Sequence, residues 1–243
     1  EIYTLSLHDA LPIYELVVKE LSFCVNSGEF FVIVGPSGSG KTTLLKMINK
    51  LIEPTSGNVY FDGVDLEDMD LRELRLDIGY VLQQGSLFPN MTVGENIELI
   101  PELNKWSKER REEESRKLLK KVGLSPELFY DRYPDELSGG EQQRVGIVRA
   151  MVTSPKILLM DEPFSALDPV IRRDLQNVVK SLHEEFATTV VFVTHDMREA
   201  VKLADRVCVM RLGEILQLDE PGIVMENPSN EFVRSFFESE DLI

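Results

Sequence analysis

The sequence has 243 residues, 43% of them hydrophobic, which is enough for one or two domains with a buried core. Its formal net charge of −16 argues against a nucleic-acid-binding protein, because such proteins need a basic surface. No apolar run is long enough to cross a bilayer. Cys24 and Cys208 lack metal-site or redox spacing, which favours two reduced core cysteines in a cytosolic protein.

Residues 1–13, EIYTLSLHDALPI, fit neither a signal peptide nor the strands and helices that follow. They resemble a translated short-read sequencing adapter, so we expect the native fold to start near Tyr14. From there, strands are predicted at 15–25, 29–34 and 57–63 because these segments are rich in β-branched and apolar residues. A helix is predicted at 43–52, and residues 71–82 read as a helix running into a strand.

Strand signals fade from residue 87 to about residue 154, where 106–124 forms a charged amphipathic helix ending at a glycine, so this stretch is predicted to be helical. Buried strands are then predicted at 156–163 and 188–196, and helices at 168–186 and 198–205. Residues 206–218 read as a strand hairpin and 228–237 as a terminal helix. Strands that alternate with helices indicate an α/β fold with a mainly parallel sheet covered on both faces.

A complete phosphate-binding loop follows the second predicted strand. A strand before the motif and a helix after it make the pattern specific, since backbone N–H groups and the helix start then converge on phosphate oxygens. Lys41 is expected to reach the β- and γ-phosphates, and Thr42 to supply a hydroxyl to Mg²⁺. The nucleotide-binding residues predicted from this motif are Gly35, Pro36, Ser37, Gly38, Ser39, Gly40, Lys41, Thr42 and Thr43.

Polar residues at the ends of three further strands complete a hydrolytic site. Asp161 is expected to hold Mg²⁺, directly or through water. Glu162 is expected to act as the general base, because side chains alternate along a strand and its carboxylate should therefore point away from that of Asp161. His195 is expected to contact the γ-phosphate. Gln83 is expected to reach the metal or the attacking water, although adjacent Gln84 leaves one residue of ambiguity.

A second glycine turn, LSGGEQQR, occupies residues 137–144 on the helical insert, where it cannot easily serve the nucleotide held by Lys41. If two chains pair with two-fold symmetry, each turn instead faces the partner's P-loop, and two nucleotides lie in one isologous interface. The ordered set of P-loop, glutamine, LSGGE, DEP, SALD and histidine motifs resembles the ATP-binding subunit of ABC transporters over about residues 14–243.

This resemblance implies a RecA-like P-loop NTPase core (about 14–86 and 155–220) with an N-terminal antiparallel β part. It also implies an inserted α-helical subdomain (about 87–154) and a C-terminal helical tail (about 221–243). The cofactors implied are ATP and Mg²⁺. The residues assigned to the partner's nucleotide or to the dimer interface are Ser138, Gly139, Gly140, Glu141 and Asp168. Gln83 would couple the site to the membrane partner.

The implied assembly is a homodimer of ATPase subunits on the cytoplasmic face of the membrane, bound to an integral-membrane permease and served by an extracytoplasmic substrate-binding protein. Segments such as IGYVLQQGSLFPNMTVGENI and VTHDMREAVKLADR are similar to quaternary-amine (glycine betaine, choline, carnitine) importer ATPases. Importers of amino acids or polyamines, and ABC ATPases outside transport, remain alternatives. The aromatic residue on which such proteins stack adenine is expected near Leu11, with Tyr14 close by.

Overall fold

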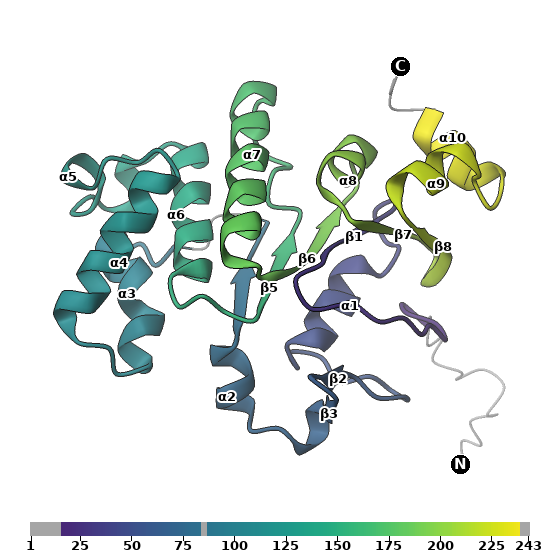
Figure 1. Ribbon diagram of the computed structural model, residues 1–243, viewed down its shortest axis with the longest axis horizontal. Helices are drawn as coiled ribbons and strands as arrows, with labels where there is room; N and C mark the ends of the chain where they lie inside the picture. Colours follow the sequence, from purple (N-terminus) through teal and green to yellow (C-terminus); the bar gives the residue numbers. More distant parts are fainter. Residues whose placement is uncertain (1–15, 84–86, 239–243) are drawn as a thin grey trace, which may run out of the picture.

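The computed structural model of the protein describes residues 16–83 and 87–238. Figure 1 shows a layered α/β fold, with helices packed on both sides of a central sheet. The strands are β1 (Phe30–Val34), β2 (Tyr60–Phe61), β3 (Val64–Asp65), β4 (Ile78–Val81), β5 (Ile157–Asp161), β6 (Thr189–Thr194), β7 (Arg206–Arg211) and β8 (Glu214–Asp219). The α-helices are α1 (Lys41–Ile48), α2 (Leu71–Leu76), α3 (Val93–Leu103), α4 (Lys108–Lys121), α5 (Pro126–Phe129), α6 (Gly139–Met151), α7 (Pro169–Phe186), α8 (Met197–Leu203), α9 (Pro221–Glu226) and α10 (Glu231–Glu238).

The central sheet has the strand order β4-β5-β6-β1-β7-β8. Every neighbouring pair is parallel except β7 and β8, which form the predicted antiparallel hairpin. A second, two-stranded antiparallel sheet joins β2 to β3. The mainly parallel α/β fold predicted from the sequence is therefore confirmed.

Alternation along β1 divides the core into two layers. Phe30, Val32 and Val34 belong to the larger layer, which also holds buried residues of α7 and α8. Phe31 and Ile33 belong to the other layer, together with buried leucines of α1. Figure 1 accordingly shows α7 and α8 on one side of the sheet and α1 on the other. Because both faces are covered, strands can be buried along their whole length, as β1 and β6 are.

The helices α3 to α6 lie together at one end of the molecule, beside α7 (Figure 1). They fall within the stretch predicted to be helical. The charged helix predicted at 106–124 forms α4, which begins after Ser107, whose hydroxyl accepts a hydrogen bond from the Arg110 N–H. The chain turns at Gly123, where the backbone φ is 78°. Packing of α3 against α4 and α6 makes these helices one layer.

The strand predicted at 15–25 is wrong for the described part, residues 16–25, which are irregular. Packing covers part of the hydrophobic pattern there: Phe23 stacks on Phe31 with ring centroids 5.3 Å apart. A backbone hydrogen bond joins the Lys19 N–H to the Gly213 carbonyl at 2.9 Å, which is too little to make a ladder. Cys24 is exposed, so only Cys208 is the core cysteine that we expected.

Residues 1–13, which include Leu11, lie outside the described residues, as does Tyr14. Neither the adapter-like segment nor the adenine-stacking position is therefore tested by the structure. Within the described ranges, no helix combines the length and the hydrophobicity that crossing a membrane requires.

Candidate nucleotide-binding site

The P-loop connects the carboxyl end of β1 to the first residue of α1. Its conformation requires glycine at two positions. A Cβ atom on Gly35, where φ is 157°, would lie 2.1 Å from the Met210 carbonyl oxygen, and one on Gly40, where φ is 90°, would lie 2.5 Å from the Val17 carbonyl oxygen. Ser37 and Gly38 are exposed at the tip of the loop. The loop is thus a backbone cradle held tightly against the sheet and open at its tip.

Lys41 lies inside this cradle and is almost fully buried. Its ammonium group donates hydrogen bonds to the carbonyl oxygens of Gly35, at 2.7 Å, and Pro36, at 3.0 Å. Burial lowers the pKa of Lys41, while the nearby carboxylates of Glu162 and Asp161 act in the opposite direction. A buried cation at the start of a helix favours an anionic ligand such as a phosphate chain.

Thr42 and Asp161 come together across the gap between α1 and the end of β5. The Thr42 hydroxyl donates a hydrogen bond to Asp161 Oδ1 at 2.9 Å. Burial raises the pKa of Asp161, and the bond from Thr42 and the positive charges of Lys46 and Lys41 partly offset that effect. The pair offers two hard oxygen donors, which fits Mg²⁺. Among the described residues, no group of three or more His, Cys, Asp or Glu side chains could hold a metal ion.

Glu162 follows directly after β5 and has a left-handed backbone conformation, with φ at 44°. Its N–H donates to the Val193 carbonyl oxygen at 2.9 Å, which ties it to the end of β6. The direction of its side chain is therefore set by this backbone reversal and not, as we expected, by strand alternation. Its Oε2 lies 3.0 Å from His195 Nδ1 and accepts a hydrogen bond from Gln83 Nε2 at 3.3 Å.

Three predicted site residues, from the ends of β4, β5 and β6, are thus brought into contact around one carboxylate oxygen. The Glu162 side chain is 16% exposed and that of His195 is 51% exposed, so the cluster opens to solvent on the histidine side. Gln84, the alternative to Gln83, lies outside the described residues. Sequence reasoning missed Ser165, whose hydroxyl donates to the Glu162 carbonyl oxygen at 3.0 Å. Its position in the SALD motif, residues 165–168, was the sequence signal that could have identified it as a site residue.

The second glycine turn forms the N-terminus of α6. Ser138 caps the helix in a reciprocal arrangement with Glu141, whose Oε2 accepts hydrogen bonds from the Ser138 N–H and hydroxyl at 2.7 Å each. These bonds lower the pKa of Glu141. Ser138 and Gly139 are exposed, whereas a Cβ atom on Gly140 would meet Ile171 of α7 at 3.0 Å. The turn is an exposed helix start, separate from the P-loop.

Asp168 caps α7, where its Oδ1 accepts hydrogen bonds from the N–H groups of Val170 and Ile171 at 3.1 Å each. It is exposed, as an interface residue in one isolated chain would be. Thr43 lies next to Thr42 in the first turn of α1, and Ser39 is buried, with its hydroxyl bonded to the Pro36 carbonyl oxygen at 2.8 Å. The structure therefore places Ser39 as a support of the loop.

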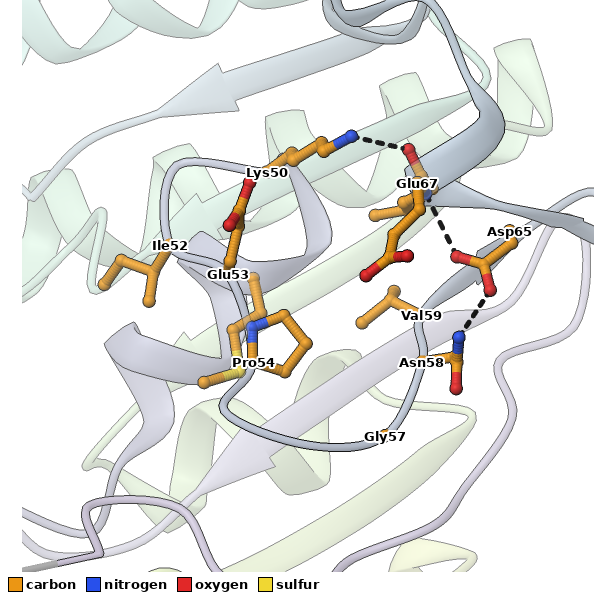
Figure 2. A pocket seen from close by; sticks show the side chains of 11 residues that line it. Lys50, Ile52, Glu53, Pro54, Gly57, Asn58, Val59, Asp65 and Glu67 are labelled. Atoms are coloured by element: carbon orange, nitrogen blue, oxygen red, sulfur yellow. Dashed lines mark hydrogen bonds between the residues drawn. The ribbon is translucent and has the colours of Figure 1, made fainter.

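A surface pocket near the end of α1 is not this site. Figure 2 shows it between the loop after α1 and the β2–β3 sheet, with Glu53 and Glu67 facing each other across it. Lys50 spans one side and donates to the Leu66 carbonyl oxygen at 2.9 Å. None of the predicted site residues lines the pocket, and its volume of about 110 Å³ is small for a nucleotide.

A strand, a P-loop and a helix, with a pair of carboxylates at the end of another parallel strand of the same sheet, define a P-loop nucleotide-binding fold. Residues 18–165 match the ABC transporter family model, and the chain belongs to this family. It is 52% identical over 226 residues to the glycine betaine/carnitine/choline transport ATP-binding protein OpuCA of Bacillus subtilis (strain 168). That alignment covers 93% of this chain and 59% of OpuCA, so the chain spans about three-fifths of that relative's length.

The glycine betaine/proline betaine transport system ATP-binding protein ProV of Escherichia coli (strain K12) is 46% identical, over 93% of this chain and 57% of ProV. Among solved structures, the fold is similar to the ATP-binding cassette MJ0796, a dimer in a post-hydrolysis state bound to ADP and Pi. The TM-score is 0.75 at 38% identity, covering 84% of this chain and 90% of that chain. The cassette cbiO1 of Clostridium perfringens has a TM-score of 0.79 at 27% identity, covering 88% of this chain and 85% of that chain.

Proposed function

We propose that the chain is the ATP-hydrolysing motor of an ABC importer. The observation that supports this most directly is the contact of Gln83 and His195 with one oxygen of Glu162, next to the Thr42–Asp161 pair. A water molecule held by Glu162 would lie beside a phosphate chain bound by Lys41, which is the geometry that hydrolysis needs. Mg²⁺, when bound at Thr42 and Asp161, would neutralise charge on the phosphates.

In this proposal Glu162 takes the proton of the attacking water. His195 holds the Glu162 carboxylate in place through Nδ1 and presents the rest of its exposed ring to the γ-phosphate. Gln83 holds the same carboxylate from the β4 side and is the residue best placed to report on the site to the neighbouring helical layer. Lys41 releases its two carbonyl partners to meet the phosphates.

We further propose that two copies act together, each supplying its Ser138–Glu141 turn to the nucleotide on the other. The exposed start of α6 supports this, because a helix N-terminus left open to solvent suits a phosphate delivered by a second chain. The dimer seen for MJ0796 is consistent with such an assembly. The helical layer α3–α6, as an inserted subdomain over about 87–154, would contact an integral-membrane permease at the cytoplasmic face, with a substrate-binding protein supplying the solute.

The solute class that we propose is quaternary-amine osmoprotectants such as glycine betaine. The names of the relatives support it, since OpuCA, ProV and the osmoprotectant import protein OsmV of Salmonella typhimurium are 46–52% identical to this chain. The test is uptake of labelled glycine betaine by cells that lack their own quaternary-amine ATPase subunits and express this chain. Restored uptake supports the assignment, and uptake of an amino acid or polyamine in its place would refute the solute class.

A further inference from the structure

Arg172, in the first turn of α7, connects two loops that carry site residues. One is the aspartate loop, residues 165–168, and the other is the histidine loop, residues 194–196. The Arg172 Nη2 donates a hydrogen bond to the Leu167 carbonyl oxygen at 3.2 Å. Its Nη1 lies 3.5 Å from Asp196 Oδ2 in an ion pair. One side chain therefore holds the residue before Asp168 and the residue after His195.

The ion pair is shielded from solvent, because the Arg172 and Asp196 side chains are 26% and 10% exposed. Nε of Arg172 is buried as well. The backbone N–H of Arg172 also donates to the Asp168 carbonyl oxygen at 2.9 Å, which fixes the start of α7 to the aspartate loop. Shielded charge pairs are screened less by salt and constrain geometry more than exposed ones do.

The histidine loop is itself held firmly around Asp196. Its N–H donates to the Thr194 hydroxyl oxygen at 3.0 Å, and that hydroxyl donates to the buried carboxylate of Glu199 at 2.7 Å. Asp196 also caps α8 through the Arg198 N–H at 2.8 Å. His195 thus lies between two anchored neighbours, and a force applied to Asp196 would move the His195 ring relative to Glu162.

We propose that Arg172 is a positioning residue that makes the aspartate loop and the histidine loop move as one unit. This inference rests on the proposed dimeric ATPase, in which Asp168 faces the partner. Closure of the partner onto Asp168 would then be transmitted through Leu167, Arg172 and Asp196 to the His195–Glu162 contact. Each site would complete its catalytic geometry only when the neighbouring chain is docked.

The test compares Arg172→Gln with Arg173→Gln, a matched loss of charge from the exposed adjacent position on α7. We expect Arg172→Gln to lower the kcat of ATP hydrolysis about 10- to 100-fold, the range for a misplaced catalytic group, while KM for ATP stays unchanged. Arg172→Lys, which keeps the charge but not the forked geometry, should recover part of the loss. Arg173→Gln should hydrolyse ATP like the wild type.

Asp196→Asn keeps the acceptor that caps α8 and removes the charge that both Arg172, at 3.5 Å, and Arg198, at 2.8 Å, meet. A double-mutant cycle with Arg172→Gln separates the Arg172 contribution from the loss of the Arg198 pair. If the link operates, Arg172→Gln combined with Asp196→Asn should be no slower than the slower single variant. Additive losses, a change in KM alone, or equal rates for Arg172→Gln and Arg173→Gln would each overturn the inference. A wild-type chain without ATPase activity would instead refute the proposed function, so the two failures are distinguishable.

Discussion

Replacing Glu162 with glutamine tests the proposed chemistry most directly. The amide has nearly the shape of the carboxylate, so the contacts of this side chain with His195 at 3.0 Å and Gln83 at 3.3 Å can persist in part. What disappears is the ability to accept a proton from water. We therefore expect ATP to bind normally and hydrolysis to stop before chemistry.

The size of the effect follows from the role assigned to the carboxylate. General-base catalysis contributes about 10²- to 10⁴-fold, so kcat should fall at least about 100-fold. The effect on stability should be small, because removing the Glu162 charge relieves its repulsion of Asp161 but also removes its attraction to Lys41. If hydrolysis opens the proposed dimer, ATP-bound dimers of this variant should accumulate.

The assay is phosphate release at saturating MgATP, with size-exclusion chromatography in ATP to follow the dimer. Glu113→Gln, an exposed position on α4, is the matched control and should behave like the wild type. Hydrolysis by Glu162→Gln at the wild-type rate would show that another group activates the water. A low rate without any dimer would mean that the variant blocks closure and not the chemical step.

Three further predictions concern the cradle and the helix start. Gly35→Ala should lose nucleotide binding and at least about 2 kcal/mol of stability, because the added Cβ would lie 2.1 Å from a backbone oxygen. Calorimetry measures the binding and chemical denaturation the stability. A variant as stable as the wild type would contradict the loop geometry. Asp161→Asn should raise the Tm of the nucleotide-free protein at pH 7 while removing Mg²⁺-dependent binding. The free-energy cost of burying the charged Asp161 carboxylate is absent below the pKa of the unfolded chain, and it grows as pH rises through the raised pKa of the folded protein. The gain in Tm should therefore vanish near pH 3. A gain that does not depend on pH would show that burial of this charge is not its cause. Ser138→Ala should cost about 1 kcal/mol by losing the α6 cap, measured by urea denaturation against Ser138→Asn, which should retain most of the stability.

Much of the site could be predicted because most of its residues lie at or just after the ends of strands. Apolar runs identified β1, β5 and β6, and parallel neighbours bring their carboxyl ends to one edge, so Lys41, Asp161 and His195 had to lie near each other. The direction of Glu162 could not be predicted, since a left-handed backbone at a non-glycine residue leaves no signal in composition. The strand prediction for residues 16–25 failed for another reason. Leu21, Phe23 and Val25 are partly buried against the core by packing, which the sequence pattern does not distinguish from pairing in a sheet.

The backbone conformation of Glu162 also places function and stability in opposition. A non-glycine residue held in this region costs about 1–3 kcal/mol, and glycine in its place would relieve that cost. Selection for thermostability alone would therefore replace the proposed base of the reaction, and a library screened only for folded protein would enrich inactive chains. Stabilising variants of this protein should accordingly be screened with hydrolysis as a second criterion at this position.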